Sequence, residues 1–175
     1  MVILLRSKDD KLLCILACCD LNMGLKSITS IAYLMQMSGW DLNYVYSITS
    51  SGLKCRLLSS YINDYMAEGY IKEKSGNFVL TKDGGEYLEG FVLQYNDSEN
   101  LEFLLNLTKV LSDEELGFIC MLDIMIKEIE DKYGADGLLR YHDTLINNLK
   151  RLTSCYSDEN FDNAVKLLRA IKEAK

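Results

Sequence analysis

The sequence contains no proline, and it has one histidine and one tryptophan among 175 residues. The lack of proline, with 49% hydrophobic residues, argues against a disordered linker or tail. The longest apolar run, Leu12–Cys19, is far shorter than the roughly 20 residues that a membrane span needs. The segment Met1–Arg6 is too short for a signal peptide. We therefore expect a cytoplasmic protein with no membrane partner.

The scarcity of histidine also limits metal chemistry. Six cysteines occur, at positions 14, 18, 19, 55, 120 and 155. Cys14 and Cys18 share one face of a predicted helix, but zinc needs four ligands and no second Cys or His pair is present. Four of the cysteines lie in apolar helical patterns, which favours free, buried thiols in a reducing compartment over disulfides. We predict no metal and no cofactor, and Cys55 is an alternative candidate for a redox-sensing thiol.

Residues for catalysis are equally scarce. His142 and Asp143 form the one acid–base pair in the sequence, but neighbours on a helix point about 100° apart and are not expected to form a dyad. The segment 134–137 lacks the Lys-Ser/Thr of a phosphate-binding loop. We therefore predict no catalytic residues and a protein that is not an enzyme.

The charge is unevenly divided. The net charge is −7, and residues 1–90 carry 9 basic against 10 acidic side chains, whereas residues 91–175 carry 10 against 16. A general nucleic-acid binder is disfavoured by this balance, and most of the acidity belongs to the C-terminal half.

The stretch Ser50–Leu88 carries the strongest structural pattern. Apolar residues recur there at three- and four-residue spacing, which predicts a helix that ends at Gly69. Its predicted inner face consists of Leu53, Leu57, Leu58, Tyr61, Ile62, Tyr65 and Met66. Two short extended pieces around 70–71 and 78–80 follow, separated by a charged turn, and Thr81 is placed to cap another helix. This order is typical of the second half of a winged helix-turn-helix domain.

Upstream, we expect a helix that Ser7 opens and that runs to about Leu21, and a second from Ser27 or Thr29 to near Gly39. Residues 42–48 alternate between apolar and polar side chains, which predicts a half-buried strand. The predicted fold class is therefore mainly α (α+β): a winged helix-turn-helix with a three-stranded wing sheet and a C-terminal helical extension.

The turn cluster Asn96-Asp97-Ser98 is the predicted boundary between two domains, 1–96 and 97–175. Beyond it the pattern is helical throughout. Ser112 and Glu115 form a predicted capping box before a very apolar helix that ends at Gly134, which we expect to be buried on several sides, within the subunit or across a dimer. Further helices are predicted over 136–152 and from Ser157 onward.

Residues 10–135 resemble the winged-helix core of Panacea-domain antitoxins and related small bacterial winged-helix proteins. The resemblance rests on Ile31-Ala32-Tyr33-Leu34, Asn43-Tyr44-Val45-Tyr46, Ser51-Gly52-Leu53, Glu68-Gly69-Tyr70-Ile71, Leu80-Thr81-x-x-Gly84-x-x-Tyr87-Leu88, Leu111-Ser112-Asp113-Glu114-Glu115 and Lys132-Tyr133-Gly134. The turn Thr49-Ser50-Ser51-Gly52 departs from the proline-containing turn of the family. The resemblance implies a non-catalytic protein that works by binding, as antitoxins bind toxins and winged-helix regulators bind DNA.

The third helix and the wing supply the candidate macromolecule-binding residues, because a DNA-reading winged helix contacts the major groove there. The residues predicted to point outward are Lys54, Arg56, Ser59, Ser60, Asn63, Lys72, Lys74 and Asn77. Residues 47–82 contain five basic and three acidic side chains, a net of +2. This modest excess is compatible with a few phosphate contacts, or with an ordinary solvated face.

Two functions remain open from the sequence. The first is a protein that recognises and neutralises another protein, such as an antitoxin or a phage-encoded inhibitor of a host protein. The second is a DNA-binding transcription regulator that forms a homodimer through its C-terminal helices.

Overall fold

A computed structural model describes residues 8–18, 23–89 and 95–173. This part of the chain is mainly helical, with two small antiparallel sheets. The helices are α1 (Lys8–Cys18), α2 (Leu25–Met37), α3 (Arg56–Ala67), α4 (Lys82–Leu88), α5 (Tyr95–Thr108), α6 (Asp113–Tyr133), α7 (Gly137–Leu152) and α8 (Asp158–Glu173). The strands are β1 (Ser47–Thr49), β2 (Gly52–Lys54), β3 (Ile71–Lys74) and β4 (Asn77–Leu80).

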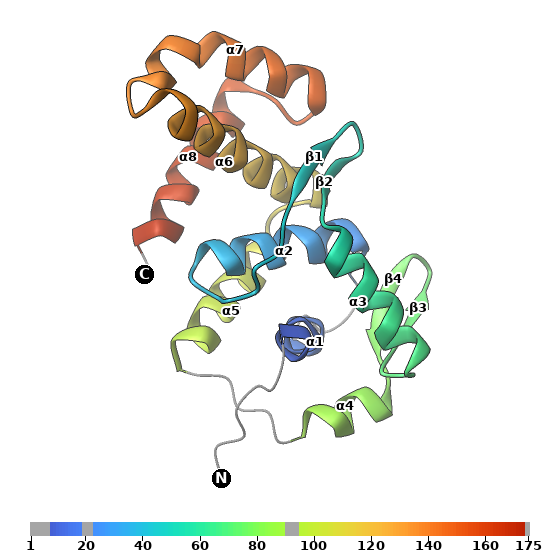
Figure 1. Cartoon of the computed structure of the whole chain (residues 1–175). Coiled ribbons are helices and arrows are strands. Elements are labelled where there is room, and N and C mark those ends of the chain that lie inside the picture. The colour runs from blue at the N-terminus through green and yellow to red at the C-terminus, as the bar shows by residue number, and fades with distance from the viewer. Residues whose placement is uncertain (1–7, 19–22, 90–94, 174–175) are drawn as a thin grey trace.

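Helix α2 lies at the centre of the molecule. The predicted inner stripe of Ile28, Ile31, Leu34 and Met35 is buried as expected, and so are Ser27, Thr29 and Ser30 on its other sides. It packs against α1 and α5 on one side and against α6, α8 and β2 on the other (Figure 1). A helix buried on most of its circumference ties the first half of the chain to the second.

The strands β3 and β4 form a tight hairpin beside α3. Ser75 and Gly76 both have positive φ, of 54° and 81°, and two such residues form the turn whose twist matches that of the flanking strands. Phe78 N donates to Met23 O at 3.1 Å, which attaches the segment between α1 and α2 to this hairpin.

The sheet at this hairpin has two strands, and the third strand expected from residues 42–48 does not join it. That segment alternates in burial as predicted, with Leu42 and Tyr44 buried and Asn43 and Val45 exposed. The backbone of Tyr44 pairs with a side chain instead, because its N–H donates to Gln36 Oε1 at 2.7 Å and its carbonyl accepts from Gln36 Nε2 at 3.1 Å. Only Ser47–Thr49 form a strand, which pairs with β2.

The start of the third helix also differs from the prediction. Gly52 has φ of 104°, which no helix accommodates, so Gly52–Lys54 form β2 and α3 begins at Arg56. Leu58, Ile62 and Tyr65 are buried as expected. Leu57, predicted to face inward, is 42% exposed.

The C-terminal helices match their predicted limits closely. Ser112 Oγ accepts from Glu115 N at 3.3 Å and Ser112 N donates to Glu115 Oε2 at 2.8 Å, so the capping box is confirmed. The turn expected at residues 96–98 is wrong, because those residues lie inside α5.

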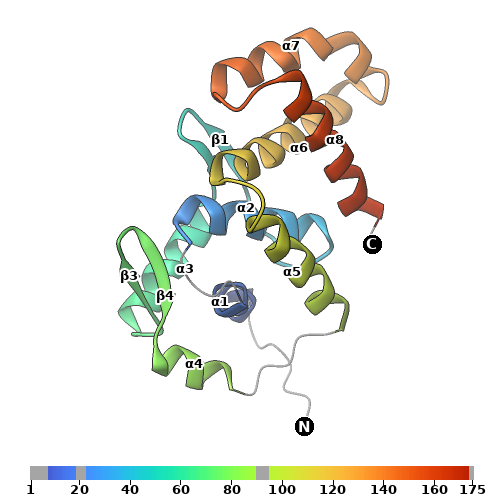
Figure 2. The ribbon, with the colours of Figure 1, turned by 180° about the vertical axis from the view of Figure 1, so that it is seen from behind.

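Helices α6, α7 and α8 form a group beyond α2 (Figure 2). The first half of α6 is buried, from Leu116 to Asp123, while the end near Tyr133 is exposed. The hairpin β1–β2 reaches α6, so it joins this group to the N-terminal half. In the described residues, no helix is long and apolar enough to cross a membrane.

Candidate functional site

The structure brings most of the predicted binding residues to the surface of α3 and of the β3–β4 hairpin. Arg56, Ser60 and Asn63 are exposed on α3, and Lys72 and Lys74 are exposed on β3. The remaining three depart from the prediction. Lys54 is exposed but belongs to β2, Asn77 is half-buried, and Ser59 Oγ donates to Cys55 O at 3.1 Å within the helix.

The exposed side chains of α3 are not predominantly basic. Arg56 is the one basic residue in the helix. Two exposed acidic residues lie at the other end: Asp64 in the last turn and Glu68 at the C-cap. The exposed Leu57 adds an apolar group to the same helix. We call the residues Arg56, Leu57, Ser60, Asn63 and Asp64 the α3 face.

Cys55 caps α3 and is not exposed. Its Sγ accepts from Leu58 N at 3.4 Å, and only 2% of the residue is exposed to solvent. Burial raises the pKa of the Cys55 thiol, against the opposing effect of the backbone N–H groups of Leu58 and Leu57. The thiolate that redox sensing requires is therefore disfavoured. Cys14, Cys120 and Cys155 likewise form no disulfide.

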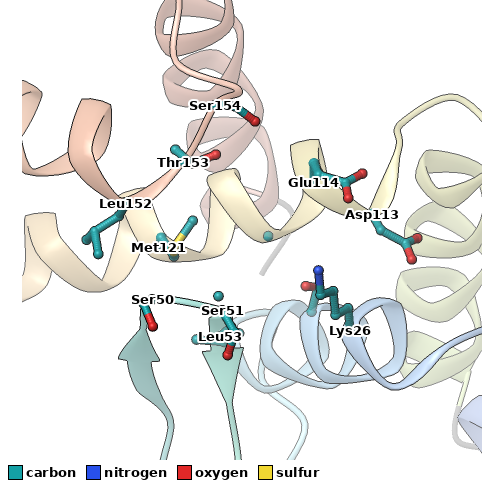
Figure 3. Close-up of a pocket in the computed structure, with 13 residues that line it drawn as sticks. Lys26, Ser50, Ser51, Leu53, Asp113, Glu114, Met121, Leu152, Thr153 and Ser154 are labelled. Atoms are coloured by element: carbon teal, nitrogen blue, oxygen red, sulfur yellow. The ribbon is translucent and has the colours of Figure 1, made fainter.

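A pocket of about 270 Å³ lies where α2, the β1–β2 turn, the start of α6 and the α7–α8 connection meet (Figure 3). Its rim is polar, with hydroxyl groups from several segments, and Leu53, Met121 and Leu152 supply apolar contacts. The polar side chains that line it are Lys26, Ser30, Ser50, Ser51, Asp113, Glu114, Thr153 and Ser154.

One polar contact beside this pocket joins two helices. Asp113 accepts a hydrogen bond from Ser27, which joins the first turn of α6 to α2. The lining contains neither histidine nor cysteine, and its ionisable side chains are Lys26, Asp113 and Glu114. No group of histidine, cysteine and carboxylate side chains in the described residues is arranged to hold a metal ion.

A charged cluster lies inside the molecule, where α2, α6 and α8 meet. Asp123 on α6 is fully buried, and its Oδ2 accepts from Tyr33 OH at 2.6 Å. Lys127 Nζ lies 2.6 Å from the same oxygen, and Lys172 Nζ lies 3.1 Å from Oδ1. Burial raises the pKa of the Asp123 carboxyl, but the hydrogen bonds from Lys127 and Tyr33 outweigh it, so the net shift is downward.

The same cluster fixes the state of Tyr33. Burial and the hydrogen bond to Asp123 both raise the pKa of its phenol above its ordinary value. Tyr33 is therefore a neutral donor at physiological pH. The three donors hold α8 against α6 and α2 through one carboxylate.

His142 and Asp143 are in contact, contrary to the expectation that they diverge. His142 Nδ1 lies 3.5 Å from Asp143 Oδ1, but both side chains are exposed on α7. The His142 ring also meets the ring of Phe161 edge to face, with 6.1 Å between the ring centroids.

Several of these groups were not identified from the sequence. The i, i+4 spacing of Asp123 and Lys127 is a detectable signal, whereas Lys172 lies 49 positions beyond Asp123 and reaches it only through the packing of α8. Leu57 was assigned to the wrong face because the helix was predicted to begin before Arg56.

No family model, no curated protein and no solved structure matches the chain. The relationship to Panacea-domain antitoxins therefore stays a prediction from the sequence.

Proposed function

We propose that residues 8–88 form a winged-helix unit and that the protein acts by binding and neutralising another protein through the α3 face. The order of elements supports the fold: two helices, a third helix after an inserted hairpin, and the β3–β4 wing. The bridge from Met23 to Phe78 occupies the place of a short first strand beside that wing.

The composition of the α3 face carries the functional proposal. A helix that enters the major groove meets phosphates on both sides, and specific binders make about 6–10 such contacts. On α3, Arg56 is balanced by Asp64 and outnumbered when Glu68 is included, and Leu57 is exposed between polar residues. Apolar and mixed-charge surfaces suit a protein partner better than a polyanion.

The inserted hairpin gives a second argument. A helix-turn-helix that reads DNA joins its two helices by a turn of about 3–4 residues. Here residues 38–55 separate α2 from α3 and include β1 and β2. The hairpin contacts α6, so the acidic C-terminal half is attached to the element that precedes the α3 face.

The test is capture of the partner by the tagged full chain from its source cells, with two variants. Leu57→Glu changes the α3 face, and Leu139→Glu changes a residue on α7 that is 86% exposed and remote from α3 (Figure 1). We expect one stoichiometric protein with the wild type and with L139E, and its loss with L57E. Equal capture by all three chains would place the binding surface elsewhere.

A DNA-binding regulator is the second candidate, because Lys54, Arg56, Lys72 and Lys74 are all exposed on α3 and the two hairpins beside it. It requires a two-fold dimer through the C-terminal helices, so that two copies of α3 meet two half-sites. It predicts that Lys54→Ala and Arg56→Ala weaken operator binding, and that the purified chain is dimeric in solution.

A further inference from the structure

The Asp123 cluster borders an open pocket whose charged lining residues are both lysines. The pocket has a volume of about 260 Å³ and is lined by Tyr33, Gln36, Met37, Lys127 and Lys172. Its volume lies just below the roughly 300–1,000 Å³ of typical small-molecule sites. The ammonium groups of both lysines are at its wall, and their side chains are 44% and 43% exposed.

The ammonium groups of Lys127 and Lys172 are the charged hydrogen-bond donors of this pocket. An ammonium has three N–H donors. In the described residues, Lys127 donates to Tyr33 OH at 3.4 Å and lies 2.6 Å from Asp123 Oδ2. Lys172 lies 3.1 Å from Asp123 Oδ1 as an ion pair without hydrogen-bond geometry. Both ammonium groups therefore keep N–H donors for a ligand in the pocket.

The other polar groups of the lining are already engaged. Tyr33 OH donates to Asp123 and accepts from Lys127. Gln36 uses both its amide oxygen and its amide nitrogen on the backbone of Tyr44. The pocket thus presents two ammonium groups with available N–H donors and an apolar contact from Met37, while Gln36 is held to the backbone of Tyr44.

The net charge of the cluster also favours an anionic ligand. Two ammonium groups share one carboxylate, so the cluster has a net charge of +1 next to the pocket. Asp123 lies behind the lysines and is fully buried, so it holds them in place without occupying the space in front of them. Two like charges held close together favour a further anion.

We propose that this pocket is a binding site for a small oxyanion, a phosphate or carboxylate group, held by Lys127 and Lys172. This inference is independent of the α3 face. The bound anion accepts N–H donors from both ammonium groups and completes an alternating arrangement of charges with Asp123. Because Lys172 belongs to α8 and Lys127 to α6, the anion stabilises the packing of the last helix.

The experiment measures thermal unfolding and titration calorimetry of the full chain with inorganic phosphate, with acetate, and with chloride at equal ionic strength. We expect phosphate or acetate to raise Tm above the chloride value, and the response to each distinguishes the two sources of oxyanion. Equal Tm in all three salts would overturn the proposal, because screening alone would then account for the effect.

Variants connect the effect to the pocket. Lys172→Met and Lys127→Met each remove charged donors, and we expect either to weaken binding of the stabilising anion about tenfold. Lys132→Met changes an exposed lysine of the same helix and leaves the pocket intact, so its binding is expected to match that of the wild type. An equal loss with K132M and K172M would contradict the assignment.

Asp123→Asn separates binding from a merely structural role of the lysines. It removes the negative charge behind the two ammonium groups and keeps the shape of the side chain. The oxyanion then becomes their main counter-charge, so the anion-specific rise in Tm is expected to exceed that of the wild type. If the rise in Tm with D123N were no greater than with the wild type, Asp123 and the anion would not share the two ammonium groups, and the proposal would fall.

Discussion

At the scale of single residues, Gly84 explains part of the sequence motif that follows the β3–β4 hairpin. A Cβ at this position would lie 2.1 Å from Tyr70 O, which is main chain and has little freedom to move. The same carbonyl accepts from Thr81 N at 2.9 Å, and Thr81 Oγ1 accepts from Gly84 N at 3.1 Å. The Thr-x-x-Gly spacing therefore allows the start of α4 to approach the start of β3.

Gly84→Ala tests this contact. The added methyl group must displace the backbone at Tyr70, so we expect the free energy of unfolding to fall by about 2 kcal/mol, as for other overpacked sites. Gly85→Ala is the matched control, because its Cβ would have no neighbour closer than 3.9 Å and alanine favours helix. Denaturant unfolding compares the two, and equal stabilities would contradict the account.

Asp123 gives a prediction about pH. Its pKa in the folded protein is depressed, so its ionised form stabilises the fold above the unfolded-state pKa of about 3.9, and this contribution is lost as pH falls through the folded-state pKa. The difference in unfolding free energy between wild type and Asp123→Asn is therefore expected to shrink between pH 5 and acidic conditions. Chemical denaturation at a series of pH values measures it, and a constant difference would argue against the pairing.

At the scale of elements, the capping box of α6 could be predicted because both of its residues lie within four positions of the sequence. Ser112 and Glu115 satisfy each other's backbone N–H groups. The backbone N–H and the hydroxyl of Ser112 both donate to the Glu115 carboxylate, and these two hydrogen bonds lower the pKa of Glu115. Ser112→Ala is expected to reduce the free energy of unfolding by about 1 kcal/mol. Ser60→Ala on the α3 face is the control with no capping role, and a comparable loss there would show that the effect is not capping.

The segment 41–49 shows where the sequence pattern was insufficient. Alternation of Leu42, Asn43 and Tyr44 correctly predicted which side chains are buried. It could not identify the hydrogen-bonding partner, because the side-chain amide of Gln36 bonds both the N–H and the carbonyl of Tyr44, as the backbone of a neighbouring strand would. An alternating pattern describes only the residues within the strand, so it does not predict a contact with a side chain eight residues upstream.

The cluster at Asp123 and the α3 face were predictable to different degrees. Arg56, Ser60 and Asn63 were correctly predicted to be exposed on α3 from helical periodicity alone. Leu57 was misassigned, because one positive-φ glycine at position 52 delays the helix by several residues. Lys172 reaches Asp123 through tertiary packing of α8, which no local pattern encodes.

At the scale of the whole molecule, the two halves of the chain are joined through α2 and the β1–β2 hairpin. Both elements contact α6, and α2 also contacts α8 (Figures 1 and 2). The α3 face and the anion pocket lie in different parts of this arrangement, since one belongs to α3 and the other to α2, α6 and α8. Variants in one are therefore expected to leave the other intact.

The measurement that tests the central claim most directly is the composition of the material captured by the tagged chain at moderate salt. The eluate is divided for mass spectrometry and for nucleic-acid sequencing, with L57E and L139E in parallel. The account predicts one protein near equimolar ratio, lost with L57E and retained with L139E, and no enriched DNA. An enriched DNA sequence with inverted half-sites, bound by a dimer and weakened by R56A, would contradict it and identify a transcription regulator.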